Sequence, residues 1–356
     1  MRSPFVYILP LAILSLILGI WGGWVRMGWA IQIPSAIPIS QHGIFMVGGF
    51  LGTLVSLERV ATLHKTILLG IPLMFGLSIP FFLFDLPNIS YLLLISGSIG
   101  YLGVCVYNYK KYKSEGDLLL LAGATFQILG HFTLSKTNSY PIAFAAWMLF
   151  LLFTIVGERL ELTRFLPKGK FQKIELYFWL FLVMFTSALY HFGTAKILSL
   201  SLIGLSQWLI RNDIALLNIK KQNSYKFLGF SLLTAFAWLA ITGIIGFLSG
   251  PFLYDALLHA FFIGFVLNMI LAHAPIIFPA LLKINHKPFH PTYYLWLIIL
   301  NLSLGLRIIG DFQENSDWRL FGGIFNGIAF IAFLLNVAFL ILKKQLYAKN
   351  YQIRSI

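Results

Sequence analysis

Apolar runs long enough to cross a membrane recur along the whole of this sequence. A helix needs about 20 mostly apolar residues to span a bilayer. Reading the runs between polar breaks predicts twelve spans, at residues 5–24, 42–62, 66–84, 89–109, 117–135, 140–158, 174–192, 195–211, 226–248, 254–282, 292–310 and 319–342. The break between the seventh and eighth runs is the weakest. We therefore predict an all-α polytopic membrane protein in which residues 1–356 form one transmembrane helical domain.

The composition agrees with this class of protein. Hydrophobic residues make up 59% of the chain and charged residues 11%, whereas soluble domains carry about 25% charged residues. The lipid bilayer is therefore the expected surrounding. Cys105 is the only cysteine, which excludes an intramolecular disulfide, a Cys-ligated cluster and the Cys-x-x-Cys-His attachment of covalent haem. Any haem would have to be held non-covalently.

The net charge of +14 is explained by loop orientation. If the N-terminus is placed inside, 21 of the 26 Lys and Arg residues fall on the cytoplasmic side, as the positive-inside rule requires. We therefore predict that both termini are cytoplasmic and that the protein is integral to the cytoplasmic (inner) membrane. The basic residues then orient loops and meet anionic lipid, so no nucleic-acid partner is expected.

Glu-Arg pairs end two of the predicted spans. Glu58-Arg59 closes the second span and Glu158-Arg159 closes the sixth, and both spans run inward. An internal helical repeat and a recurring local helix end explain this echo equally well.

Two histidines are the first candidates for a cofactor site. His42 opens the second span and His259 lies near the outer end of the tenth, so the two are predicted at similar depth. Ionisable side chains in a span are costly and are usually functional, and neutral imidazole is the commonest protein metal ligand. At about 100° per residue, His42 lies in line with Gly49, Thr53 and Ser56. Such a strip suits a flat ligand, or it allows two helices to approach closely.

The polar residues deeper in the spans suggest a second feature. His273 lies about 21 Å beyond His259 along an ideal helix, so the two cannot bind one iron atom. Pro275 and Pro279 predict that the helix is kinked or ends there. His273 and Glu58 at comparable depth would form a proton relay or a structural pair, or His273 would bond to carbonyls that the prolines free. Asn268 in mid-span is either helix glue or part of a path.

Further candidates lie near the predicted outer face. His131 and His191 each end a span and are possible second-site ligands or ordinary interfacial histidines. Arg26 and Arg307 are outer-side cations that would neutralise haem propionates or reach lipid phosphate. Asp311 stands one helical turn after Arg307 and offers it a local partner.

The motifs around the first two histidines resemble a known family. The chain has His42, Gly49-Phe50 in its second span and His259-Ala260, Gly264, Met269 and Ala272 in its tenth. This pattern, with twelve spans, resembles NnrS-like membrane proteins, a branch of the haem–copper oxidase superfamily fold linked to nitric-oxide metabolism. The resemblance implies one haem b held by both histidines, with Gly49 beside it and Arg26 and Arg307 as propionate partners.

The sequence also departs from the oxidase pattern. Phe261 stands where that pattern has a second histidine, and Pro141–Glu158 lacks the copper-binding histidine and its tyrosine. Both departures argue against copper and against oxygen reduction at a dinuclear centre. What the resemblance implies is a membrane haem protein of electron transfer or nitric-oxide metabolism. Whether it is an oxidoreductase, and with which redox partner or small-molecule ligand, stays open, and no catalytic residue is identified.

Two other functions fit the same residues. In a proton-coupled transporter or permease, the path would be lined by His259, His273, Asn268 and Glu58, and the prolines would break a helix at the binding site. In a catalytic reductase, His131 or His191 would hold a second metal.

Overall fold

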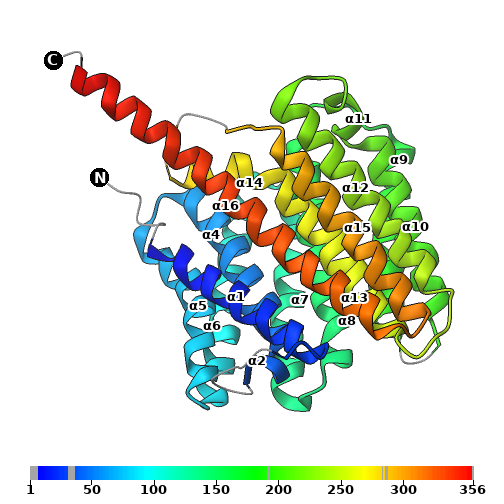
Figure 1. The fold of residues 1–356 in the computed structure, drawn as a ribbon. Helices are drawn as coiled ribbons and strands as arrows, with labels where there is room; N and C mark the ends of the chain where they lie inside the picture. Colours follow the sequence, from blue (N-terminus) through cyan, green and yellow to red (C-terminus); the bar gives the residue numbers. More distant parts are fainter. Residues whose placement is uncertain (1–6, 31–36, 191–192, 283, 285–287, 355–356) are drawn as a thin grey trace. The chain divides into compact units, whose positions relative to one another are not determined.

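The computed structural model of the chain describes residues 7–30, 37–190, 193–282, 284 and 288–354. Within these residues the secondary structure is entirely helical (Figure 1). The chain divides into two compact units, residues 1–201 and 202–356. Each unit is described by itself.

The first unit is a bundle of helices that are consecutive in the sequence. Its elements are α1 (Leu9–Arg26), α2 (Ile37–Ser40), α3 (His42–Ile44), the π-helix η2 (Phe45–Leu51), α4 (Gly52–Leu63), the 3₁₀-helix η3 (Thr66–Leu69), α5 (Gly70–Leu83), α6 (Pro87–Tyr112), α7 (Glu115–Thr137), α8 (Tyr140–Leu162) and α9 (Lys170–Ala188). The next helix, α10 (Ala195–Asn212), crosses from this unit into the second.

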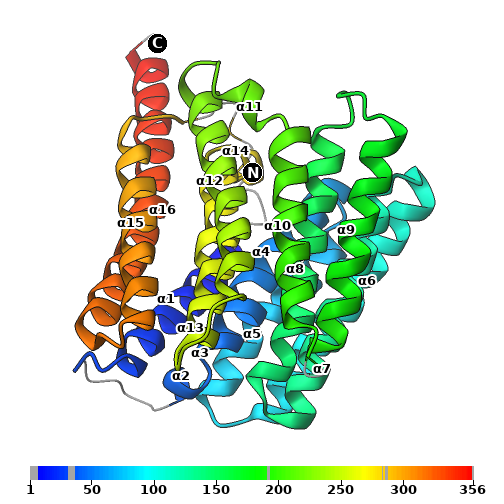
Figure 2. The ribbon, with the colours of Figure 1, turned by 90° about the vertical axis from the view of Figure 1, so that its right-hand side faces the viewer.

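The second unit contains a long pair of helices at its C-terminal end. Its elements are α11 (Ala215–Asn218), α12 (Asn223–Ile245), α13 (Leu253–His259), the π-helix η5 (Ala260–Leu267), α14 (Asn268–Leu281), α15 (Thr292–Phe312) and α16 (Ser316–Arg354). Figure 2 shows α15 and α16 side by side and antiparallel.

Ten helical segments within the described ranges are long and apolar enough to cross a membrane. They correspond to ten of the twelve predicted spans, which confirms an all-α, multi-pass membrane protein. The seventh and eighth predicted spans form α9 and α10, but these two helices are not apolar enough to be counted as membrane-crossing. Their polar residues are the reason, because α9 opens with Lys170, Lys173 and Glu175, and α10 carries Lys196 and Arg211 near its ends.

Small residues allow the closest helix packing in the first unit. A Cβ placed on Gly123 of α7 would lie 2.8 Å from Thr154 Oγ1 of α8. One placed on Gly130, two turns further along α7, would collide with the indole of Trp147. The turns between helices are closed by residues in the left-handed conformation, such as Lys113 after α6 and Asn138 after α7. These local features fix α6, α7 and α8 as an antiparallel series.

Candidate functional site

His42 is held by a neighbouring helix in the first unit. Its Nδ1 lies 2.5 Å from the carbonyl oxygen of Gly19 on α1. Its ring also packs on Gly23, where an added Cβ would lie 2.9 Å from Cε1. Because a carbonyl oxygen can only accept a hydrogen bond, Nδ1 carries a proton, and in the neutral form of the ring Nε2 is the basic nitrogen.

His259 has the same arrangement in the second unit. Its Nδ1 lies 2.8 Å from the backbone oxygen of Asp255, one turn earlier in α13. The Asp255 carboxylate is also near, with Oδ1 3.4 Å from Nδ1. Nδ1 is therefore the donor here too, and in the neutral form of the ring Nε2 has the lone pair. Metal-binding histidines commonly donate their second N–H to a carbonyl or carboxylate in this way.

A π-helical segment follows each of these two histidines. η2 begins three residues after His42, and η5 begins at the residue after His259. π-Helical turns are rare and occur frequently at functional sites. They also correct the sequence prediction of an aligned strip, because the count of about 100° per residue holds only for an α-helix. His42 and Ser56 are separated by seven π-helical residues, so that angular alignment does not apply.

The glycine predicted beside the ligand serves protein packing. A Cβ on Gly49 would lie 2.6 Å from Ile79 on α5 and 2.7 Å from Ser15 Oγ on α1. The absence of a side chain at Gly49 therefore lets three helical segments of the first unit meet. Ser56 hydrogen-bonds to the backbone oxygen of Gly52 at 2.6 Å.

Four charged residues form a cluster around Asp255, drawn from α13, α15 and α16. Arg307 Nη2 lies 2.9 Å from Asp255 Oδ2, and Arg319 Nη2 lies 3.7 Å from the same oxygen. Arg319 Nε is 2.6 Å from Asp311 Oδ1. The expected local pair between Arg307 and Asp311 is wrong, since each finds its ionic partner on another helix. Arg26, the other predicted propionate partner, is exposed at the end of α1.

Asn268 lies in a saturated amide network. Its Nδ2 donates to Gly264 O at 2.7 Å and to Asn301 Oδ1 at 3.0 Å, while its Oδ1 accepts from Asn301 Nδ2 at 3.0 Å. Trp238 Nε1 donates to the same Asn301 oxygen at 2.6 Å. The network joins α12, α14 and α15 at the end of the π-helix. Of the two roles predicted for Asn268, the contacts match helix glue.

His273 lies on a helix that continues through both prolines. α14 extends from Asn268 to Leu281 with Pro275 and Pro279 inside it, so the prediction that a helix could end there is wrong. His273 Nδ1 lies 2.7 Å from the backbone oxygen of Met269. The two prolines leave the carbonyl oxygens of Leu271 and Pro275 without an amide donor. His273 Nδ1 bonds to neither of these, so the predicted bond to a carbonyl that the prolines free is wrong.

Glu58, the other residue of the predicted proton path, lies in the middle of α4 beside an ion pair. The neighbouring Arg59 has its Nη2 3.4 Å from Glu158 Oε1 on α8. The two Glu-Arg pairs of the sequence therefore lie next to each other in the first unit.

His131 is fully buried among four helices of the first unit. Its ring centroid is 6.1 Å from that of Phe75 and 6.0 Å from that of Trp147. Its Nδ1 lies 3.0 Å from Ser98 Oγ, and that hydroxyl donates to Leu94 O at 2.8 Å. His131 Nδ1 is then the donor and Nε2 the basic nitrogen, which has no hydrogen-bond partner among the described residues. His191, its predicted companion, lies outside the described residues.

The described side chains form no group of three or more His, Cys, Asp and Glu placed to hold a metal ion. A site with two histidine ligands would not be such a group. Asp255, Arg319, Asn301 and Ser98 were not singled out from the sequence. Asp255 could have been, because it is an acidic residue one helical turn before a histidine in an apolar run.

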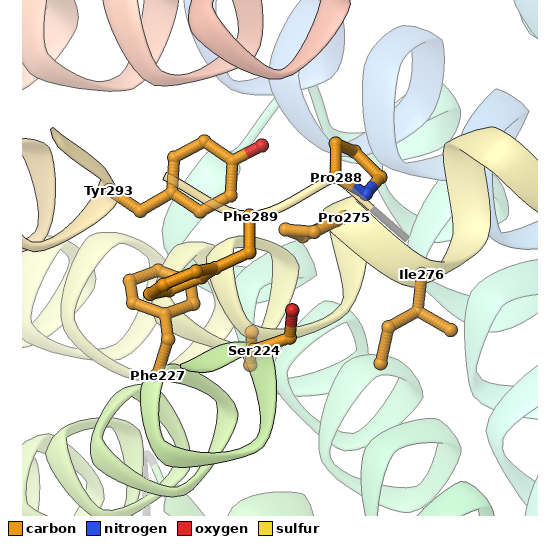
Figure 3. A pocket seen from close by; sticks show the side chains of 8 residues that line it. Ser224, Phe227, Pro275, Ile276, Pro288, Phe289 and Tyr293 are labelled. Carbon is orange, nitrogen blue, oxygen red and sulfur yellow. The ribbon is translucent and has the colours of Figure 1, made fainter. Parts of the chain in front are cut away.

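A small hollow lies at one end of the second unit (Figure 3). The hollow has a volume of about 10 Å³. It is lined by Ser224, Phe227, Ala272, Pro275, Ile276, Pro288, Phe289 and Tyr293. The Tyr293 hydroxyl is buried and has no hydrogen-bond partner within the described part of the chain. This space matches about one water molecule, so the hollow is far too small for haem.

The fold defines a multi-pass helical membrane protein. The chain belongs to the family described as a domain of unknown function, DUF8744, whose model matches residues 5–342. No curated protein and no solved structure matches the sequence.

Proposed function

We propose that this protein is a membrane haem b protein in which His42 and His259 are the two iron ligands. The observation that supports this proposal is the state of the two rings. Each Nδ1 donates to a backbone carbonyl, so in the neutral form of each ring Nε2 has the lone pair that a haem iron takes. Haem b is thus compatible with the tautomers of both histidines.

The two arginines predicted to bind the haem propionates differ in how well they suit that role. Arg26 is exposed and suits a propionate. Arg307 is buried and already bound to Asp255, so it would meet a propionate only as part of that charged cluster. Bound haem supplies one-electron redox chemistry. Because two histidine ligands would leave the iron no open position for a substrate, we propose electron transfer, within nitric-oxide metabolism or nitric-oxide stress, as the role of the site.

The same proposal includes a finer topology. We propose that α9 and α10 complete twelve spans, that both termini are cytoplasmic, and that the membrane is the cytoplasmic (inner) one. The support is the distribution of charge, since 21 of the 26 Lys and Arg residues fall on one side under this topology.

An optical spectrum of the purified full chain tests the haem. We expect a Soret band after expression with added haem precursor, and a reduced-minus-oxidised spectrum typical of bis-histidine ligation. His42→Ala and His259→Ala should each abolish or strongly reduce the band. His64→Asn is the matched control, because His64 is exposed and has a left-handed backbone that Asn tolerates.

A wild-type protein without a Soret band, or a band that both alanine variants retain, would overturn the proposal. Substrate-dependent uptake by haem-free proteoliposomes would then favour the proton-coupled transporter. Loss of that uptake in His273→Ala would assign His273 to the path.

A further inference from the structure

The cluster around Asp255 places a carboxylate directly behind His259. Asp255 contacts His259 Nδ1 twice, through its backbone oxygen at 2.8 Å and through Oδ1 at 3.4 Å. Its other carboxylate oxygen, Oδ2, forms ion pairs with Arg307 and Arg319. One residue therefore connects an imidazole on one side to two guanidinium groups on the other.

Three helices fix the position of this carboxylate. Arg307 comes from α15 and is buried, and Arg319 comes from the start of α16. Arg319 is itself fixed by Asp311 and by Phe252, whose ring centroid is 3.7 Å from the guanidinium carbon. Side chains locked by this many contacts hold a partner in one geometry.

We propose that Asp255 is a positioning residue for His259, and that Arg307 and Arg319 tune its effect. This inference rests on the proposed function, because His259 is taken there as an iron ligand. Asp255 fixes the ring orientation through its backbone oxygen. Its carboxylate strengthens the electron donation of Nε2.

The charges of the cluster predict opposite effects for two kinds of variant. Ferric haem carries one more positive charge than ferrous haem, so a nearby negative charge stabilises the ferric form. Removing the Asp255 charge should raise the reduction potential of the haem. Removing the Arg319 charge leaves Asp255 less neutralised and should lower it. A general loosening of the helices would not produce shifts of opposite sign.

The experiment uses the full chain in detergent with haemin as the probe, and measures haemin affinity by titration and reduction potential by spectroscopy. We expect Asp255→Asn, which keeps the backbone acceptor and removes only the carboxylate charge, to raise the potential and to weaken haemin binding by about 10-fold, the low end of the effect of losing an outer-shell partner. Asp311→Asn is the matched control, since it removes one carboxylate of the same cluster that does not touch His259. Its effect on haemin affinity should be much smaller.

Arg319→Gln is the second variant, and it keeps the test valid if Asp255→Asn does not fold. Arg319 is 21% exposed at its side chain, so its replacement is the milder change. A Soret band whose affinity and potential are the same in Asp255→Asn and Asp311→Asn, or a potential that rises in Arg319→Gln, would overturn this inference and leave the haem proposal intact. A wild-type chain that binds no haemin would overturn both.

Discussion

Arg59 and Glu158 lie 3.4 Å apart, although 99 residues separate them in the sequence. Each belongs to one Glu-Arg pair, the first in the middle of α4 and the second near the end of α8. The contact shows that the two Glu-Arg pairs are neighbours in the first unit. Both side chains are largely buried, at 18% and 26% exposure, so this ion pair is screened less by solvent than a surface pair.

Reversing one charge of this pair should destabilise the first unit. We expect Arg59→Glu or Glu158→Arg to cost about 1–3 kcal/mol, because each leaves like charges together in a poorly solvated place. The double exchange should recover part of the loss. The measurement is the melting temperature of the detergent-solubilised protein, followed by tryptophan fluorescence.

The matched control is Lys173→Glu, which reverses the exposed pair between Lys173 and Glu115. Exposed pairs are worth about 0–1 kcal/mol, so this change should be nearly silent. Equal losses at the two pairs would contradict the structural reading of Arg59.

Gly264 should tolerate no side chain. A Cβ there would lie 2.5 Å from Trp238 Cγ, and this ring is held by its bond to Asn301. Gly264→Ala should therefore cost about 1–3 kcal/mol through overpacking. Gly305→Ala on α15 is the control, because nothing lies within 4 Å of its added Cβ.

The control change should be neutral or stabilising by up to about 1 kcal/mol, since alanine favours the helix over glycine. Melting temperatures of the two variants, measured side by side, decide the matter. Loss of stability in both variants alike would show that α12 and η5 are not packed as described.

Ser98 should stabilise the fold by accepting the hydrogen bond of His131. Ser98→Ala removes this acceptor in a fully buried place and leaves His131 with the backbone oxygen of Leu94, at a cost of about 1 kcal/mol. Ser135→Ala removes a hydroxyl that only bonds its own helix at Phe132 O, so its melting temperature should stay near that of the wild type. If the two serines proved equivalent, the orientation assigned to the imidazole would be wrong.

Cysteine labelling should reveal the sidedness of α6 and α7. Cys105 is buried and is the only cysteine, so Cys105→Ala gives a clean background. In that background we expect a membrane-impermeant maleimide to label Lys136→Cys from outside the cell, and Lys111→Cys only after the membrane is opened. Both lysines are exposed at opposite ends of the α6–α7 pair. Labelling in the reverse pattern would invert the proposed topology.

Much of the helical fold could be predicted because membrane insertion depends on local composition. An apolar run of sufficient length forms a helix wherever it lies, since its backbone groups must bond within the segment. The same reasoning failed to detect the π-helices η2 and η5, because a change from α to π pairing depends on how neighbouring helices pack. It also predicted either a kink or a helix end at Pro275 and Pro279, and α14 continues through both prolines to Leu281.

The same distinction between local and long-range features applies to the candidate site. The sequence itself determined which residues are chemically unusual, because histidines, arginines and an asparagine in apolar runs stand out at any position. Only the tertiary structure decided their partners. Arg307 pairs with Asp255, 52 residues away, and not with Asp311 one turn along its own helix. His42 donates to Gly19 on another helix. Partners on other helices are chosen by which helix faces meet, and no local pattern of residues carries that information.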